Sequence, residues 1–158
     1  LVLMADALVP LARNISDIGA PITDVVGPAN RDLADPLYVR ATVTATSKLL
    51  KPFAPTRVRA TRTPAGIVID FVRRSRIDSD AWEAVDIPLG EASEAYEAEI
   101  ALPTGLRTLS ATTPSIVYPA AQELADFGAP QSTLTLSLYQ MSATVGRGFP
   151  FTGALAVQ

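Results

Sequence analysis

Short runs in which polar and apolar residues alternate, separated by Gly and Pro, constrain the fold of this chain more than any other feature. Thirteen prolines and nine glycines leave segments too short for a helical bundle or a coiled coil. Alternation with a period of two is typical of a strand that buries one face. The best runs, Thr133–Tyr139 and Ile67–Val72, predict five buried side chains: Ile69, Phe71, Leu134, Leu136 and Leu138.

Further strand-like runs follow one another closely in the second part of the chain. They are Arg57–Arg62, Trp82–Ile87, Tyr96–Ile100, Leu106–Leu109 and Ser115–Tyr118, and Phe149–Val157 offers a final strand. About seven short strands with turn signals between them are typical of an antiparallel β-sandwich. We therefore predict an all-β fold of this kind.

One short helix is predicted within the sandwich, over Pro119–Pro130. Proline suits the start of a helix, and Gly128 suits the left-handed residue that ends one. Ala120, Leu124 and Phe127 fall on one face at helical spacing. We expect a turn or two of helix across one end of the sandwich.

Two prolines in Lys51-Pro52-Phe53-Ala54-Pro55 divide the chain. Proline fixes φ and biases its predecessor toward extended backbone, so residues 51–55 are predicted to be a stiff linker. Residues 1–50, with Tyr38–Thr46 as their best strand, are too few to bury a core alone and need upstream strands or a neighbouring subunit. Residues 56–145 are predicted to form the sandwich, and residues 146–158 a last strand or a C-terminal tail.

The absence of both Cys and His excludes several classes of site within this chain. These are a disulfide scaffold, a Cys/His zinc site, a Ser-His-Asp triad and a Cys-His dyad. The formal net charge of -3 gives no global field that favours nucleic acid or an anionic membrane. The most apolar stretch, residues 1–10, is too short to span a membrane. Because the first residue is Leu1 rather than Met, we expect a fragment or a processed product.

Charge is distributed in blocks. Residues 57–76 hold six arginines and a single acid, whereas residues 78–99 hold eight acids and no base. A basic patch of this kind suits the phosphates of nucleic acid or lipopolysaccharide, but no aromatic residue interleaves the arginines. We favour pairing of the two blocks, or a solvated face. The arginines are Arg57, Arg59, Arg62, Arg73, Arg74 and Arg76, and the acids are Asp78, Asp80, Glu83, Asp86, Glu91, Glu94, Glu97 and Glu99.

Candidate catalytic and binding residues are few. Glu97 with Glu99, or Glu91 with Glu94, suggests glycosidase-type chemistry, which needs a cleft that desolvates one carboxyl. A small sandwich face rarely supplies such a cleft, so we predict no catalytic residue, no cofactor and no metal site.

Three further motifs have a structural and a functional interpretation. Asp78-Ser79-Asp80 is more typical of a polar turn than of a calcium loop. Trp82 suits a core more than a sugar-stacking site. Val145-Gly146-Arg147-Gly148 lacks the strand–loop–helix context of a phosphate loop and predicts a hairpin or a domain exit.

One ordered set of motifs covers nearly the whole chain. It comprises Leu8–Ala12, Val26–Asp32, Lys51–Pro55, Val72–Trp82, Ile87–Glu97, Arg107–Leu109, Tyr118, Gln122, Ala125–Gly128, Tyr139–Ser142 and Val145–Gly148. In order and spacing, these residues resemble the C-terminal region of the large multidomain baseplate protein of alphaproteobacterial gene transfer agents, phage-like particles that package host DNA.

This resemblance implies a fibronectin type III-like module from about residue 53, preceded in residues 1–50 by the end of a tail-hub domain. It implies a homo-oligomer, expected to be a trimer around the tail axis, with other baseplate and tail proteins as partners. The glycoside-hydrolase-like barrel of the family lies far upstream, so the resemblance assigns no enzymatic activity to this segment. The expected location is the tail baseplate of a virion-like particle, extracellular after release, with no direct nucleic acid binding.

Three functions follow from these observations. The first is a structural component of a baseplate that supports cell-envelope attachment and DNA delivery. The second is a sandwich that binds a carbohydrate or receptor, such as a host cell-surface glycan, through exposed aromatic rings. The third is a non-catalytic spacer of a cell-wall-degrading enzyme. Exposed aromatics favour binding, whereas buried aromatics and a symmetric interface favour the structural role.

Overall fold

A computed structural model of the chain describes residues 12–28, 30–78 and 86–158. The chain divides into two compact units, Leu1–Lys48 and Leu49–Gln158. Both consist mainly of antiparallel β-structure, and only the second has a hydrophobic core among the described residues.

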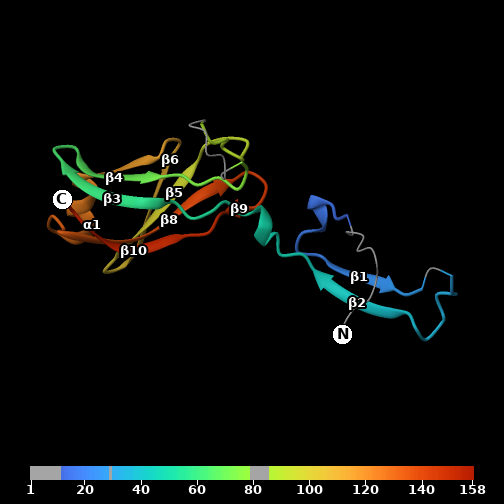
Figure 1. Cartoon of the computed structure of the whole chain (residues 1–158). Helices are drawn as coiled ribbons and strands as arrows, with labels where there is room; N and C mark the ends of the chain where they lie inside the picture. Colours follow the sequence, from blue (N-terminus) through green and yellow to red (C-terminus); the bar gives the residue numbers. More distant parts are fainter. Residues whose placement is uncertain (1–11, 29, 79–85) are drawn as a thin grey trace. The chain divides into compact units, whose positions relative to one another are not determined.

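The first unit is a two-stranded ribbon. Strands β1 (Pro21–Val26) and β2 (Val39–Thr44) pair antiparallel along their full length, and a 3₁₀ turn at Ile15–Asp17 precedes them (Figure 1). None of the residues described in this unit is buried. The predicted strand at Tyr38–Thr46 is confirmed, but a ribbon of two strands is marginal without a second layer.

The second unit is an antiparallel β-sandwich with one short helix, which confirms the predicted fold class (Figure 1). One sheet has the order β3-β4-β7, with strands Thr56–Thr63, Gly66–Val72 and Ser115–Pro119. The other has the order β10-β8-β5-β6, with strands Phe151–Ala156, Thr133–Ser142, Tyr96–Leu102 and Gly105–Ala111. The short strand β9 (Gly146–Arg147) pairs with β8.

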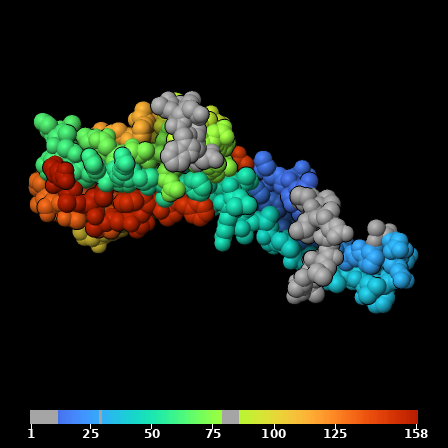
Figure 2. Space-filling model, viewed as in Figure 1, coloured from blue at the N-terminus to red at the C-terminus, as the bar shows by residue number. Residues whose placement is uncertain are grey.

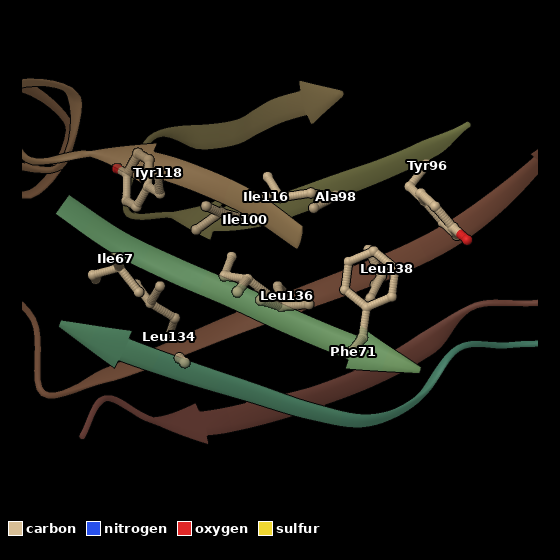
Figure 3. Packing of buried hydrophobic residues seen from close by; sticks show 12 residues of the cluster. Ile67, Phe71, Tyr96, Ala98, Ile100, Ile116, Tyr118, Leu134, Leu136 and Leu138 are labelled. Atoms are coloured by element: carbon tan, nitrogen blue, oxygen red, sulfur yellow. The ribbon is translucent and has the colours of Figure 1, made fainter. Parts of the chain in front are cut away.

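The core lies between these two sheets. All five side chains that the alternation predicted are buried, because every second residue of β4 and β8 faces the opposite sheet (Figure 3). The rings of Phe71 and Tyr96 meet edge to face, with centroids 4.7 Å apart. The full set of buried hydrophobic residues is Ala60, Ile67, Ile69, Phe71, Tyr96, Ala98, Ile100, Ile116, Tyr118, Leu134, Leu136 and Leu138.

The helix α1 (Ala120–Phe127) forms where the sequence predicts it, but its packed face differs. Pro119 caps its start, and Gly128 ends it in the left-handed conformation with φ 74°. Leu124 is 56% exposed, whereas Glu123 is only 2% exposed. The expectation from apolar spacing was therefore wrong for Leu124, because an ion pair rather than an aliphatic side chain attaches this helix to the sandwich.

The segments at both ends of the sandwich pack against it. Residues 51–55, predicted to be a linker, include two buried prolines, and the Pro52 carbonyl accepts a hydrogen bond from the Phe149 amide at 2.9 Å. The C-terminal segment, for which strand and tail were both open, forms β10. Beyond β10, Gln158 exchanges backbone hydrogen bonds with β3, so the red C-terminal strand lies against the green β3 (Figures 1 and 2).

One predicted strand is not among these elements. The run Trp82–Ile87 lies mostly outside the described residues, and its last two residues, Asp86 and Ile87, are not in a strand. Between the two sheets, the described residues of β4, β5, β7 and β8 place their buried side chains toward one another, as Figure 3 shows.

Candidate functional site

One face of the β1–β2 ribbon is apolar. The register pairs Ile22 with Val43 and Val26 with Val39, and these four side chains share a face because pairs two positions apart point the same way. Val26, Val39 and Val43 are 54%, 63% and 58% exposed. Exposed apolar groups gathered on one strand face mark a surface that another chain or segment covers.

The opposite face of the ribbon is more polar, because it carries Thr23, Thr42, Thr44 and Arg40 beside Pro21 and Val25. Thr23 and Thr42 face each other across the strands, with their hydroxyl oxygens 2.8 Å apart. The apolar face contains one acid, Asp24, which pairs with Arg13. Since its one charge is already paired, the apolar face suits an uncharged partner surface more than a solvated one.

In the second unit, Arg147 joins two carboxylates on the outer face of the five-stranded sheet. Its guanidinium contacts Glu97 and lies 2.7 Å from a carboxylate oxygen of Glu99. It also lies 4.7 Å from the ring centroid of Tyr139, within the range of a cation–π contact. Hydrogen bonding to Glu99, and then to Glu97, raises the pKa of Arg147. Glu97 and Glu99 thus lie on one strand face, and the single guanidinium offsets one of their two negative charges.

The other pair considered for catalysis is also engaged. Glu91 accepts a hydrogen bond from Arg76 at 2.9 Å. Glu94 accepts one from the Tyr96 hydroxyl at 2.7 Å, and burial together with this bond raises the pKa of Tyr96. The two glutamates therefore stabilise separate elements, and their contacts are those of structural groups.

Pairing of the arginine block with the acidic block is partly confirmed. Arg76 contacts Glu91, and Arg73 lies 3.7 Å from Asp86. Arg62, however, pairs with Glu123 of α1 through two hydrogen bonds of 2.9 and 3.0 Å. Among the described residues, the acidic block therefore pairs with two members of the arginine block, Arg73 and Arg76.

The Glu123 carboxylate is the main attachment of α1. Besides Arg62, it accepts a hydrogen bond from the Gln131 amide at 2.6 Å, while Arg62 donates to the Gln131 carbonyl at 2.7 Å. The hydrogen bond from Arg62 lowers the pKa of Glu123 against the opposing effect of burial. A buried carboxylate satisfied in this way fixes the helix relative to β3 and to the residues that precede β8.

A second network attaches the other end of α1. Asp126 accepts hydrogen bonds from the Arg107 Nε and from the Tyr118 hydroxyl, both at 2.8 Å. The Arg107 bond, aided by Tyr118, lowers the pKa of Asp126. Burial and the Asp126 bond raise the pKa of Tyr118. The helix is thus held to β6 and β7 by this carboxylate.

Sequence reasoning did not find these helix networks. Glu123 and Asp126 are three residues apart, which is a signal that both lie on one helix face. Their partners are distant in sequence, Arg62 by 61 positions and Arg107 by 19. These two arginines come close to the helix only because the fold places β3 and β6 near it, so local spacing in the sequence does not reveal them.

A hollow of about 550 Å³ lies beside the end of β4. Phe53, Val72 and Ile87 provide its apolar lining, Arg73 and Arg74 its basic lining, and Ser75 and Asp86 complete it with a hydroxyl and one carboxylate. The Arg74 guanidinium stacks over the Phe53 ring at 5.0 Å from the centroid. The sequence motifs did not indicate this hollow.

The structure describes only one of the three remaining sequence motifs in full. Gly146–Arg147 forms a hairpin with β8, as one of the two interpretations of Val145–Gly148 predicts. Ser79, Asp80 and Trp82 lie outside the described residues. Among the residues that the structure describes, no group of three or more acidic side chains gathers as a metal site would require, and no helix has the length and apolarity to cross a membrane.

Comparison with protein-family models gives no match to this chain, and a search of curated proteins gives no relative. Two surfaces of the described residues have the chemistry of binding surfaces. One is the apolar face of the β1–β2 ribbon, formed by Ile22, Val26, Val39 and Val43, and the other is the basic and apolar hollow beside β4.

Proposed function

We propose that this chain is a structural part of the baseplate, or tail tip, of a gene transfer agent or related phage-like particle. In this role it supports attachment to the cell envelope and delivery of DNA. The ordered motifs that resemble the C-terminal region of the gene-transfer-agent baseplate protein support the proposal. A β-sandwich that follows a separate ribbon agrees with the expected order of a hub end and a fibronectin type III-like module.

The observation that carries the proposal is the unburied apolar face of the β1–β2 ribbon. The described part of this unit has no buried residue, and its contacts are the pairing of two strands with a few exposed hydrogen bonds and ion pairs. A ribbon of this kind gains stability only when its apolar face is covered. We propose that neighbouring copies cover it in a trimer, or another ring, around the tail axis, and that other baseplate and tail proteins contact the assembly.

Among the described residues, the contacts of four aromatic rings support a structural role over recognition of a carbohydrate or receptor, whereas Phe149 remains 41% exposed. Tyr96 and Tyr118 are buried in the core. Arg147 stacks on Tyr139, and Arg74 stacks on Phe53, so neither ring presents a bare face on that side. Sugar binding on a sandwich uses rings that remain open for stacking. The hydrogen-bonded carboxylates likewise support a non-catalytic segment rather than a hydrolase, with any glycosidase activity residing upstream.

The proposal is tested by crosslinking in the assembled particle, with the unsubstituted protein as the background control, because these 158 residues contain no cysteine. Val43→Cys places a thiol on the apolar face, and Thr42→Cys places one on the polar face as a matched control. We expect crosslinks between copies of the full-length protein from Val43→Cys under mild oxidation or a short bismaleimide, and few from Thr42→Cys.

The density map of the particle provides the second readout. Several copies around the axis, with residues 1–50 at their contacts, would agree with the proposal. One copy on the axis, or equal crosslinking from both cysteine variants, would contradict it. Turnover of glycan or peptidoglycan by the purified chain, abolished by Glu97→Gln or Glu99→Gln, would instead favour an enzyme.

A further inference from the structure

The hollow beside β4 combines two kinds of surface that a single ligand can use. Phe53, Val72 and Ile87 are 38%, 50% and 41% exposed and give it an apolar wall. Its volume of about 550 Å³ falls in the range of roughly 300–1,000 Å³ that is usual for small-ligand sites. A hollow of this size accommodates an acyl or aryl group.

The wall of this hollow is fixed by Arg73. Its guanidinium donates to the backbone carbonyls of Ile87, at 2.7 Å, and Pro88, at 3.3 Å. These bonds tie the 86–88 segment to the end of β4. The Arg73 guanidinium is therefore occupied by protein groups, since Asp86 also lies 3.7 Å from it.

Arg74 differs from Arg73 because its guanidinium remains available. It is exposed, and among the described residues no carboxylate pairs with it. Stacking on Phe53 holds it at the hollow while leaving its N–H groups free to donate in the plane of the guanidinium. Arg74 is thus positioned to bind an anion at the mouth of an apolar site.

A second arginine reaches the same area from β3. The register of β3 against β4 shifts between Thr56 and Arg59, and Arg57 within this bulge has φ 51°, a left-handed conformation that costs energy for a residue with a side chain. Arg57 lines a smaller hollow of about 260 Å³ that shares Val72 with the larger one. The bulge therefore brings a further exposed guanidinium next to the apolar wall.

The local charge is unbalanced. Arg57, Arg59, Arg73 and Arg74 line the two hollows together with two acids, Asp70 and Asp86, so arginine is in excess. Arg73 lies 3.7 Å from Asp86, whereas Arg57 and Arg74 form no ion pair in the part of the chain that the structure describes. Two guanidinium groups, one from β3 and one just beyond the end of β4, match a doubly charged phosphate attached to an apolar body.

We propose that this site binds an anionic amphiphile, whose phosphate group contacts Arg57 and Arg74 and whose acyl chain occupies the hollow lined by Phe53, Val72 and Ile87. The inference goes beyond the proposed assembly role and does not depend on it, since every residue involved lies in the sandwich unit.

The test titrates the 158-residue chain with dihexanoyl phosphatidic acid below its micelle concentration, followed by amide NMR shifts and calorimetry. Two partial ligands run in parallel: inorganic phosphate, which has the charge alone, and dihexanoyl phosphatidylcholine, which has the acyl chains with a zwitterionic head. We expect saturable shifts centred on Val72, Arg74 and Ile87 with phosphatidic acid only. Raising NaCl from low to high concentration should weaken this binding.

Variants separate the site from general basic charge. Arg57→Gln and Arg74→Gln should each weaken phosphatidic acid binding by about three- to tenfold, since each removes a charged hydrogen bond. Arg40→Gln, an exposed arginine of the ribbon, removes the same charge elsewhere and should leave the affinity unchanged. The melting temperature of each variant verifies its fold.

Several results would overturn the inference. Unchanged affinity in the Arg57→Gln/Arg74→Gln double variant would exclude the two guanidinium groups. If inorganic phosphate binds as tightly as phosphatidic acid, the apolar wall does not contribute to affinity. If phosphatidylcholine binds as tightly as phosphatidic acid, the negative charge of the headgroup does not contribute. Displacement of the lipid by an equal concentration of a short acidic peptide would assign the site to a peptide instead.

Discussion

The ribbon and the sandwich are built from the same kind of antiparallel pairing, yet only the sandwich buries its apolar residues. In the ribbon, six residue pairs align without a bulge, and Val39 and Val43 remain mostly exposed. In the sandwich, the single strand β8 buries Leu134, Leu136 and Leu138, each at most 1% exposed. Strand pairing is therefore insufficient for a stable unit. A backbone hydrogen bond between strands is only slightly more favourable than the hydrogen bonds that the same groups make to water, and apolar side chains are buried only when a second layer covers them.

The two units also differ in how they use charge. In the sandwich, Glu123 and Asp126 fix a helix to three strands through several hydrogen bonds each. In the ribbon, the Arg13–Asp24 pair lies between exposed groups. An ion pair of the second kind contributes little to stability, so it does not compensate for the missing core.

The largest expected difference appears when the units are separated. Residues 49–158 expressed alone should give dispersed amide NMR signals and a single cooperative unfolding transition, because their core is complete. Residues 1–48 alone should give the narrow signals of an unfolded chain. Cooperative unfolding of the 1–48 peptide would break the comparison, since it would require a core that the described residues lack.

The next effect compares matched truncations in the two units. Leu136→Ala should lower the free energy of unfolding of the sandwich by about 2–5 kcal/mol, because it leaves a cavity between the sheets. Val43→Ala should change that value by less than about 0.5 kcal/mol, as expected for an exposed side chain. Urea titration of both variants measures the difference, and similar losses would show that the ribbon is as well packed as the sandwich.

A smaller effect tests the helix attachment. Glu123→Gln should reduce the unfolding free energy by about 1–3 kcal/mol, because Arg62 and the Gln131 amide lose a charged acceptor. Asp86→Asn removes a carboxylate whose side chain is fully exposed and should cost less than about 0.5 kcal/mol. If the two variants lose equal stability, the buried pair has no special role.

The smallest effect is the dependence of stability on pH. The pKa values of Glu123 and Asp126 are lowered in the folded chain, so the unfolded chain binds protons first as the pH falls. Thermal stability should be level above the ordinary carboxyl range of about pH 4 and decline below it until the lowered values are reached. Melting curves from pH 7 to pH 2 check this decline, which should be shallower in a Glu123→Gln/Asp126→Asn variant. An equal decline in that variant would assign it to other groups.

Local signals were sufficient for much of this fold. The alternation of β4 and β8 located five core residues, and the Pro119 and Gly128 signals located α1 to within a residue. These predictions held because a period of two and a left-handed helix end are properties of neighbouring residues. The apolar spacing in α1 wrongly predicted that Leu124 faces the sandwich, because polar contacts of a short helix can decide which of its faces packs.

The sequence by itself determined which faces of the strands are apolar, where the turns fall, and that no Cys- or His-based chemistry is possible in this chain. The tertiary structure alone decided that Glu123 reaches Arg62, that Arg147 joins Glu97 to Glu99, and that an apolar hollow lies beside Arg74. The physical reason is range. Backbone preference and alternation act between near neighbours, whereas charge pairing and the shape of a hollow depend on strands that are distant in sequence and meet only after the sheets have formed.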